Sequence, residues 1–286
     1  MAGEHPSRPV AAALGRGARA WLAEASDAVI SLFFPAGCRI CDALLTRAGR
    51  VPICEDCLAS FEAPPERSCE ICGQPQPAFV TEPGELVLCR ACQVKTYAFE
   101  RARTYGTYEG ALARAILILK WERMEPLAAW FAARLAEVVS RQGDKLAAAD
   151  VVVPVPLHKN RQRQRGYNQA ALISKSLARR LHLPHQELLL VRTRPRPDKQ
   201  ILSLDERWAS VRGAFATRPG SQVDNRRVLL VDDVMTTGAT LDACARALLD
   251  GGARAVVGLT IARAAHNPFP VPETGQRKQR DERKPA

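Results

Sequence analysis

Residues 228–240 read Val-Leu-Leu-Val-Asp-Asp-Val-Met-Thr-Thr-Gly-Ala-Thr, and this stretch decides the fold class. Four apolar residues predict a buried strand, and Asp232 and Asp233 leave its C-terminal end. A Thr-Thr-Gly-Ala-Thr turn follows, and the apolar spacing then predicts a helix over residues 241–249. Open α/β sheets bind ligands beyond the carboxyl ends of their strands, so we expect a binding site at this turn.

The turn has the chemistry of a phosphate site. A glycine-containing turn at a helix N-terminus offers free backbone N–H groups and a partial positive charge. Thr236, Thr237 and Thr240 add hydroxyl donors, and Gly238 allows a close backbone approach. The two carboxylates need donors, which a ribose diol beside its own 5′-phosphate supplies. The segment resembles the phosphoribosyl pyrophosphate signature of type I phosphoribosyltransferases; the alternative is an Asp-Asp turn that caps an ordinary βα unit.

The cysteines form a second pattern. Nine are present, and eight of them make four Cys-x-x-Cys pairs: Cys38/Cys41, Cys54/Cys57, Cys69/Cys72 and Cys89/Cys92. Two such pairs complete a tetrahedral thiolate site for zinc, and a closed four-thiolate site is structural. Disulfide pairing is the alternative, but it needs an oxidising compartment and no export signal is visible. Chain order predicts two consecutive ribbons with one Zn²⁺ each, although crossed pairing of the first pair with the third stays open.

Composition and local pattern divide the chain. Its 286 residues have room for about two domains. No apolar run reaches the roughly 18 residues of a membrane span, and charges interrupt the apolar stretch near the N-terminus, so we expect a cytoplasmic protein without a transmembrane segment. The expected parts are a leader helix at 1–37, a double zinc-ribbon module at 38–95, a phosphoribosyltransferase-like domain at 96–265 and a disordered basic tail at 266–286.

Strands and helices alternate after the cysteines. Apolar runs predict strands at 151–155, 187–191, 228–231 and 255–261. Helical spacing predicts helices around Leu112, Ile116 and Leu119, and at 126–139 and 168–182. The predicted fold class is therefore α/β, with a mostly parallel sheet flanked by helices.

Basic residues gather in two places. Residues 158–169 carry four Lys or Arg side chains and no acid, and they follow the predicted strand at 151–155. A second group, at 192–199, falls on a predicted long loop. These groups suit a pyrophosphate with bound Mg²⁺. They equally suit a single-stranded nucleic-acid backbone, with Tyr167 or Trp208 available for base stacking, or a solvated basic surface. The net charge of +11 agrees with anionic partners.

The order of motifs adds a resemblance. After the cysteine pairs come Phe-Glu-Arg-Ala-Arg-Thr-Tyr-Gly-Thr-Tyr-Glu-Gly (99–110), Leu-Lys-Trp (119–121), Pro-Val-Pro-Leu (154–157), Arg-Gly-Tyr-Asn-Gln-Ala (165–170) and the Asp-Asp turn. Over residues 28–263 the chain resembles the ComF/GntX family of amidophosphoribosyltransferase-like competence proteins. This resemblance implies a zinc-ribbon module fused to a type I phosphoribosyltransferase fold. It also implies a role in natural transformation, on the cytoplasmic side of single-stranded DNA import, while related members are linked to gluconate use.

The resemblance also implies site residues. Asp232 and Asp233 would hold the ribose hydroxyls, and Asp233 is the nearest candidate base. Two groups would bind the charged ends of phosphoribosyl pyrophosphate and its Mg²⁺. They are the 5′-phosphate turn of Thr236, Thr237, Gly238, Ala239 and Thr240, and the pyrophosphate loop of His158, Lys159, Arg165 and Gly166. The chain departs from the family pattern at two places. The pattern Thr-x-x-Gln-x-x-Leu is not kept, because Gln200 is one residue out of register with Leu202, and Ser210 replaces the asparagine that precedes Gly-Ala-Phe.

Three functions fit these features. The first is a phosphoribosyltransferase with an unknown acceptor, and the second is a phosphoribosyl-pyrophosphate-binding regulator that never turns over. The third is a non-catalytic adaptor that binds single-stranded nucleic acid on a retained phosphoribosyltransferase scaffold. We expect a donor-binding transferase fold that serves DNA uptake, with single-stranded DNA and DNA-uptake proteins as partners.

Overall fold

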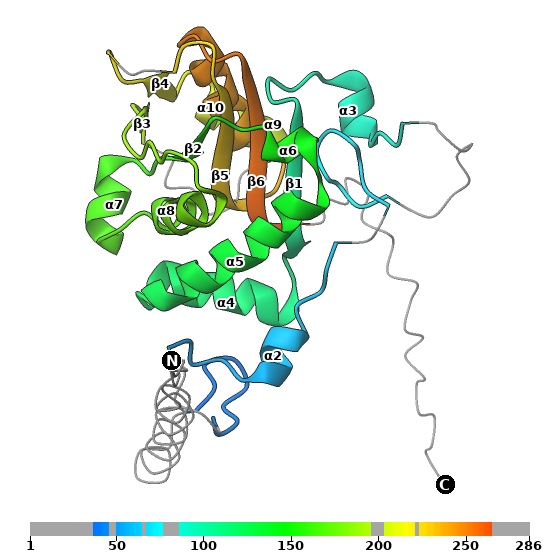
Figure 1. The fold of residues 1–286 in the computed structure, drawn as a ribbon, viewed down its shortest axis with the longest axis vertical. Coiled ribbons are helices and arrows are strands. Elements are labelled where there is room, and N and C mark those ends of the chain that lie inside the picture. The colour runs from blue at the N-terminus through cyan, green and yellow to red at the C-terminus, as the bar shows by residue number, and fades with distance from the viewer. Residues whose placement is uncertain are drawn as a thin grey trace, which may run out of the picture.

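A parallel sheet forms the centre of the molecule (Figure 1). The structure is a computed structural model that describes residues 37–45, 50–64, 67–76, 86–195, 203–220 and 223–264. Within these ranges, four strands pair in the order β1–β6–β5–β2, and every neighbouring pair is parallel. The strands are β1 (Arg101–Thr107), β2 (Val151–Pro154), β5 (Arg227–Met235) and β6 (Ala255–Arg263).

The two central strands are buried on both faces, as expected for a parallel sheet covered by helices. Successive side chains point to opposite faces, so β5 contributes to two separate cores. Leu229 and Val231 belong to one apolar cluster, whereas Val228 and Leu230 belong to the other. The apolar run predicted from the sequence is thus the centre of the sheet.

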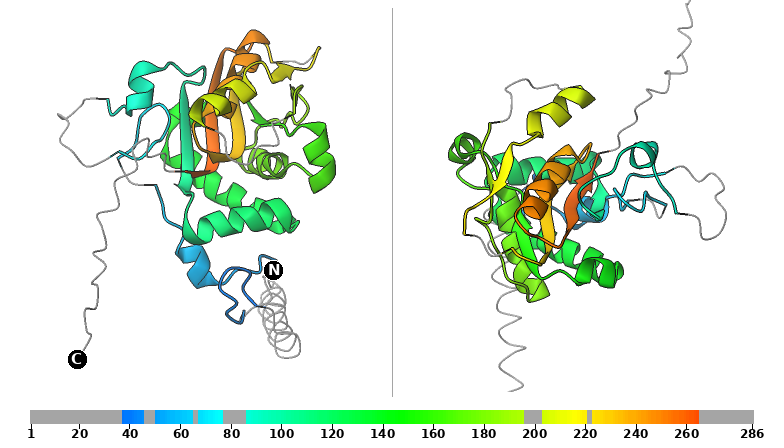
Figure 2. Two further views of the ribbon diagram at one scale, coloured as in Figure 1. Left: turned by 180° about the vertical axis from the view of Figure 1, so that it is seen from behind. Right: turned by 90° about the horizontal axis from the view of Figure 1, so that it is seen from above.

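Helices cover both faces (Figure 2). On one face lie α4 (Gly110–Trp121), α5 (Glu125–Arg141) and α8 (Gln169–Leu181), with the short α6 (Asp144–Ala147) after α5. On the other lie α10 (Ala239–Asp250) and α9 (Leu204–Val211), together with an antiparallel pair of short strands, β3 (Leu190–Arg192) and β4 (Phe215–Thr217). The helix α7 (Lys159–Arg165) connects β2 with α8.

Two local predictions need correction. The strand predicted at 187–191 is the short β3, which pairs antiparallel with β4 and lies outside the main sheet. The basic stretch after β2 is mostly helical rather than a loop: His158 caps α7 through its imidazole, and Gly166 ends the helix with a positive φ of 84°. The strand β1 was not predicted, because Tyr105 is the only large ring or aliphatic side chain among its seven residues and the others are Arg, Ala, Thr and Gly.

The cysteine-rich segments pack against the α/β part at two different places. The first segment contains α2 (Glu55–Ala59) and joins the apolar cluster of α4 and α5. The second contains α3 (Arg90–Val94) and joins the cluster under α10. The predicted leader helix lies outside the described residues except for Gly37, and the predicted tail lies wholly outside them. Within the described ranges, no helix has the length and apolar character needed to cross a membrane.

Candidate functional site

The acid pair lies inside β5 rather than in a turn after it. The strand continues through Asp232 and Asp233 to Met235, and Asp232 still pairs with Thr260 of β6. The backbone N–H of Asp233 donates to the Asp232 carboxylate at 2.8 Å. Strand geometry sends the two side chains in opposite directions from the backbone, so the acids face different partners.

The turn after β5 is shaped by one glycine. Gly238 caps α10 with φ 80°, and a Cβ there would lie 2.7 Å from the Met235 side chain and 3.0 Å from the Tyr97 ring. Gly238 has no side chain with which to cap α10, and the Thr237 hydroxyl accepts a hydrogen bond from the Ala239 N–H at 3.3 Å. The other N–H groups of the first turn have no carbonyl partner within the helix, so they are available to an anion.

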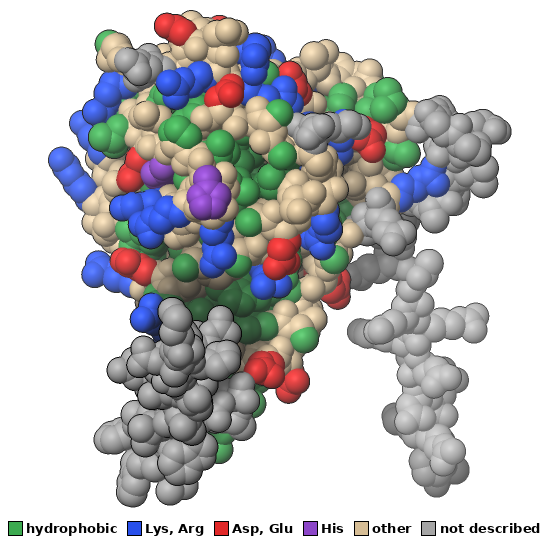
Figure 3. All heavy atoms as spheres, viewed as in Figure 1, with side chains coloured by type: hydrophobic (Ala, Val, Ile, Leu, Met, Phe, Trp, Pro, Cys, Tyr) green, Lys and Arg blue, Asp and Glu red, His purple; other side chains and the backbone are tan. Residues whose placement is uncertain are grey.

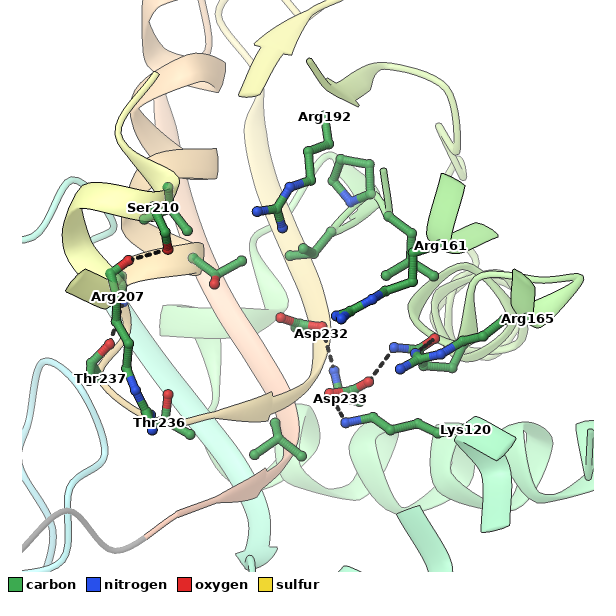
Figure 4. A pocket seen from close by; sticks show the side chains of 18 of the residues that line it. Lys120, Arg161, Arg165, Arg192, Arg207, Ser210, Asp232, Asp233, Thr236 and Thr237 are labelled. Atoms are coloured by element: carbon green, nitrogen blue, oxygen red, sulfur yellow. Dashed lines mark hydrogen bonds and ion pairs between the residues drawn. The ribbon is translucent and has the colours of Figure 1, made fainter. Parts of the chain in front are cut away.

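A cavity of about 330 Å³ opens at the carboxyl ends of β5 and β2 (Figure 4). Its lining contains the acid pair and four residues of the turn: Asp232, Asp233, Thr236, Thr237, Ala239 and Thr240. Five cationic side chains of the described residues also line it: Lys120, Arg161, Arg165, Arg192 and Arg207. An excess of cations over carboxylates suits a ligand with several negative charges.

Asp233 is held by a chain of polar contacts. The Lys120 ammonium, at the end of α4, lies 2.9 Å from one carboxylate oxygen of Asp233. The side-chain amide of Gln169 donates to the other oxygen at 2.5 Å, and Arg165 donates to the oxygen of that amide at 2.8 Å. All four side chains are largely buried, so their charges and dipoles interact with little screening by water.

Asp232 has a different environment. It faces the cavity near Arg161 (Figure 4). Removal from bulk water and the adjacent Asp233 carboxylate raise the pKa of Asp232 to about 8. A carboxyl group with such a pKa exchanges its proton near neutral pH, which is the range that suits general acid–base chemistry.

Only some of the residues predicted to form the pyrophosphate loop line the cavity. Arg165 lines it, is 9% exposed, and has an Nε without a hydrogen-bond partner among the described residues. Its guanidinium also lies 4.5 Å from the centre of the Trp121 ring. His158, Lys159 and Gly166 are not in the lining, whereas Arg161, one turn before Arg165, is.

Lys120 and Gln169 were not predicted to be site residues. They belong to the motifs Leu-Lys-Trp and Arg-Gly-Tyr-Asn-Gln-Ala, and these motifs are the feature of the sequence that could have identified them. The second basic group is represented in the cavity by Arg192, while residues 196–202 lie outside the described ranges. Ser210 lines the cavity, and its hydroxyl donates to the Arg207 carbonyl oxygen at 2.8 Å.

The eight paired cysteines form two clusters in chain order. Within each cluster the four sulfur atoms lie within 4.8 Å of one another: Cys38, Cys41, Cys54 and Cys57, then Cys69, Cys72, Cys89 and Cys92. The Cys41–Cys54 and Cys72–Cys89 sulfur distances are both 3.6 Å. A zinc tetrahedron with bonds of about 2.3 Å requires about 3.8 Å, whereas a disulfide requires about 2 Å. The clusters therefore fit two structural zinc sites, and the crossed pairing is excluded.

A parallel sheet with this acid pair and turn, joined to two four-cysteine clusters, defines a type I phosphoribosyltransferase fold with an N-terminal double zinc ribbon. Residues 168–273 match the phosphoribosyl transferase domain family, and residues 29–93 match the double zinc ribbon domain family. The chain belongs to the ComF family of competence-related phosphoribosyltransferase-like proteins.

Three relatives illustrate this membership. The DNA utilization protein YhgH of Escherichia coli K12 is 34% identical over 170 residues, which cover 59% of this chain and 74% of that protein. Competence protein F of Haemophilus influenzae is 29% identical over 183 residues, covering 62% and 78%. Competence protein ComFC of Bacillus subtilis is 28% identical over 220 residues, covering 74% and 84%.

Proposed function

We propose that the cavity binds phosphoribosyl pyrophosphate with Mg²⁺, and that the protein uses this site in handling DNA during uptake. The observation that carries the proposal is one cavity that is lined by the acid pair, the turn before α10 and five cationic side chains. The turn would bind the 5′-phosphate, and the acids would accept the ribose hydroxyls. The relatives named for competence and DNA utilization support the proposed role in DNA uptake.

The cationic side of the cavity would receive the pyrophosphate. Lys120, Arg161 and Arg165 lie on one side of the acid pair, and Arg207 with the threonines lies on the other (Figure 4). A donor that spans the acid pair would therefore place its pyrophosphate near the first group and its 5′-phosphate near the second. Mg²⁺ would add oxygen coordination to the pyrophosphate and neutralise part of its charge.

If transfer occurs, an acceptor attacks the anomeric carbon while pyrophosphate leaves. Asp233 was the candidate base from the sequence, but both of its oxygens already accept contacts from Lys120 and Gln169. We therefore assign proton acceptance to Asp232, whose carboxyl faces the cavity and has a pKa of about 8. Asp233 and Lys120 would fix the geometry of the ribose subsite.

Calorimetric titration of phosphoribosyl pyrophosphate with Mg²⁺ tests the proposal. Micromolar binding by the wild type should disappear in Asp232→Asn/Asp233→Asn and persist in Asp250→Asn, which removes a carboxylate outside the cavity. An acceptor screen with pyrophosphate release as the readout then separates a transferase from a donor-binding regulator. A folded, zinc-loaded wild type that does not bind the donor would refute the site assignment.

The adaptor function stays a second candidate because of the basic surface. Lys and Arg side chains gather over α7 and α8 on one face of the molecule (Figure 3). In α7, Lys159 and Arg163 are exposed and the helix contains no acid. Fluorescence anisotropy with a labelled single-stranded oligonucleotide tests this candidate. Binding that weakens steeply with salt and survives in the double aspartate variant would favour the adaptor over the donor-binding protein.

A further inference from the structure

The second cysteine cluster shares one hydrophobic core with the phosphate-type turn. Its four cysteines are buried in the same hydrophobic core as Met235, at the start of the turn, and Ala239, at the start of α10. Tyr97 and Phe99, which follow the cysteines in the chain, belong to the same core, and the centres of their stacked rings are 4.7 Å apart. The cluster and the turn are therefore connected by continuous packing.

Tyr97 makes the direct contact with the turn. Its hydroxyl donates to the Thr237 carbonyl oxygen at 3.1 Å, and this bond is buried. In a trans peptide the C=O and the following N–H point in opposite directions. Fixing the Thr237 carbonyl toward Tyr97 therefore turns the Gly238 N–H away from the ring. The adjacent residue also contributes, because the Ala98 N–H donates to the Asp242 carboxylate, in the first turn of α10, at 2.7 Å.

A second connection runs from the cluster to the sheet. Arg263, at the end of β6, is 4% exposed and donates to the Cys72 sulfur at 3.7 Å. The same guanidinium donates to the Gln74 side chain at 2.9 Å. A cation beside a zinc thiolate stabilises the charge of the site and orients the ligand. The cluster thus contacts the strand next to β5 as well as the turn after it.

In the described ranges the first cluster makes no contact with the turn, and the segment after it contacts the end of β1 instead, where the Thr107 N–H donates to the Glu62 carbonyl oxygen at 3.0 Å. It lies beyond α4, where Arg39 pairs with Glu122 and Phe61 packs edge-on against Trp130 at 5.4 Å. Cys41 is exposed and Cys54 is half-buried, whereas the second cluster is buried throughout. The two clusters have the same ligands but different neighbours.

We propose that Tyr97 is a positioning residue for the phosphate-binding turn, and that zinc in the second cluster, unlike zinc in the first, sets the affinity for the donor through it. The proposal rests on the proposed donor site. Zinc would hold the segment that ends at Cys92, which places Tyr97 and Ala98 against the turn. Loss of that zinc would release the Thr237 carbonyl and the first turn of α10.

Two readouts test the proposal. The first is the affinity for phosphoribosyl pyrophosphate with Mg²⁺, measured by calorimetry. The second is amide hydrogen exchange of a peptide covering residues 234–242 without ligand, which does not depend on donor binding. Tyr97→Phe removes only the hydroxyl. We expect donor affinity to fall by about three- to tenfold, and exchange in the turn to accelerate by a similar factor.

Tyr105→Phe is the matched control. Tyr105 lies on β1, and its ring contacts Trp130 rather than the turn. This variant should bind and exchange as the wild type does. If Tyr97→Phe also behaved as the wild type, the positioning role would be refuted. If the wild type failed to bind the donor, the proposed function would fail, and exchange in the turn would still decide the role of Tyr97.

Single cysteine variants compare the clusters. Cys92→Ser and Cys41→Ser should each reduce the measured zinc content. We expect Cys92→Ser to weaken donor binding at least about tenfold and Cys41→Ser to change it less than about twofold. Equal effects in the two variants would overturn the proposal. Where Cys92→Ser does not fold, the exchange measurement on Tyr97→Phe decides.

Discussion

Lys120 offers the sharpest test of the site, because its ammonium and the Asp233 carboxylate form an ion pair with little access to water. The atoms are 2.9 Å apart, and the two side chains are 16% and 8% exposed. At an effective dielectric constant of 20, this separation corresponds to an attraction of about 6 kcal/mol. Desolvation offsets part of that attraction, but removal of one partner leaves a buried charge uncompensated and typically costs about 3–5 kcal/mol.

We therefore expect Lys120→Met to destabilise the zinc-loaded protein by about 3 kcal/mol at pH 7. For a domain of this size, that loss lowers the melting temperature by roughly 6–12 °C, which differential scanning calorimetry measures directly. Lys175→Met is the matched control: Lys175 is exposed on α8, and its loss should shift the melting temperature by less than about 2 °C.

A double-mutant cycle separates the pair from other effects of the lysine. Asp233→Asn removes the charge but keeps the shape, so Lys120→Met should cost much less in that background. We expect a coupling free energy of at least about 2 kcal/mol between the two positions. A coupling below about 0.5 kcal/mol would refute the reasoning, because it would mean that the ammonium does not stabilise Asp233.

Three further predictions concern acid, glycine and zinc. The pKa of Asp232 is raised in the folded state, so the protonated Asp232 carboxyl contributes stability that is complete below the unfolded pKa of 3.8 and is lost as the pH rises through about 8. The melting temperature of the wild type should therefore fall from pH 6 to pH 9, and that of Asp232→Asn should fall less. Gly238→Ala should lower the free energy of unfolding by about 1–2 kcal/mol, because the new Cβ would sit on a backbone with positive φ and close to the Met235 side chain. Thermal melts measure this loss, and an unchanged melting temperature would contradict it. Metal analysis should find about two zinc ions per chain, and a chelator with a colorimetric indicator should remove the zinc of the exposed first cluster faster than that of the buried second one. Release in a single phase would contradict that difference.

Local patterns were sufficient where local interactions decide the structure. Four apolar residues and a glycine turn predicted the central strand and the helix after it, and the structure extends the strand to Arg227–Met235. Cys-x-x-Cys spacing predicted two four-cysteine sites, because each pair fixes its own two ligands. The helix α8 begins within one residue of the start predicted for the helix at 168–182, and the Asn168 side chain caps it by accepting from the Ala170 N–H.

Long-range contacts could not be predicted from local sequence patterns. Lys120 and Asp233 are 113 positions apart, so only the tertiary fold brings the end of α4 to the acid pair of β5. The partner of β3 was mistaken because three strand residues do not specify whether they join a parallel sheet or a short antiparallel pair. The basic stretch was expected to be a loop but forms α7, because its Lys, Arg and Gln side chains have a high helix propensity.

The pairing of β1 with β6 has a consequence for biosynthesis. Arg101 lies in register with Val257, so the first strand of the sheet acquires its only neighbour in the described sheet when the last strand has been made. Until then a nascent chain exposes the apolar faces of β5 and the residues around the second cysteine cluster. Contacts so distant in sequence close slowly. Translation that stops before residue 263 should therefore yield a chain whose second cysteine cluster lacks the Arg263 contact and whose central sheet is incomplete, which makes it a substrate for chaperones and proteases.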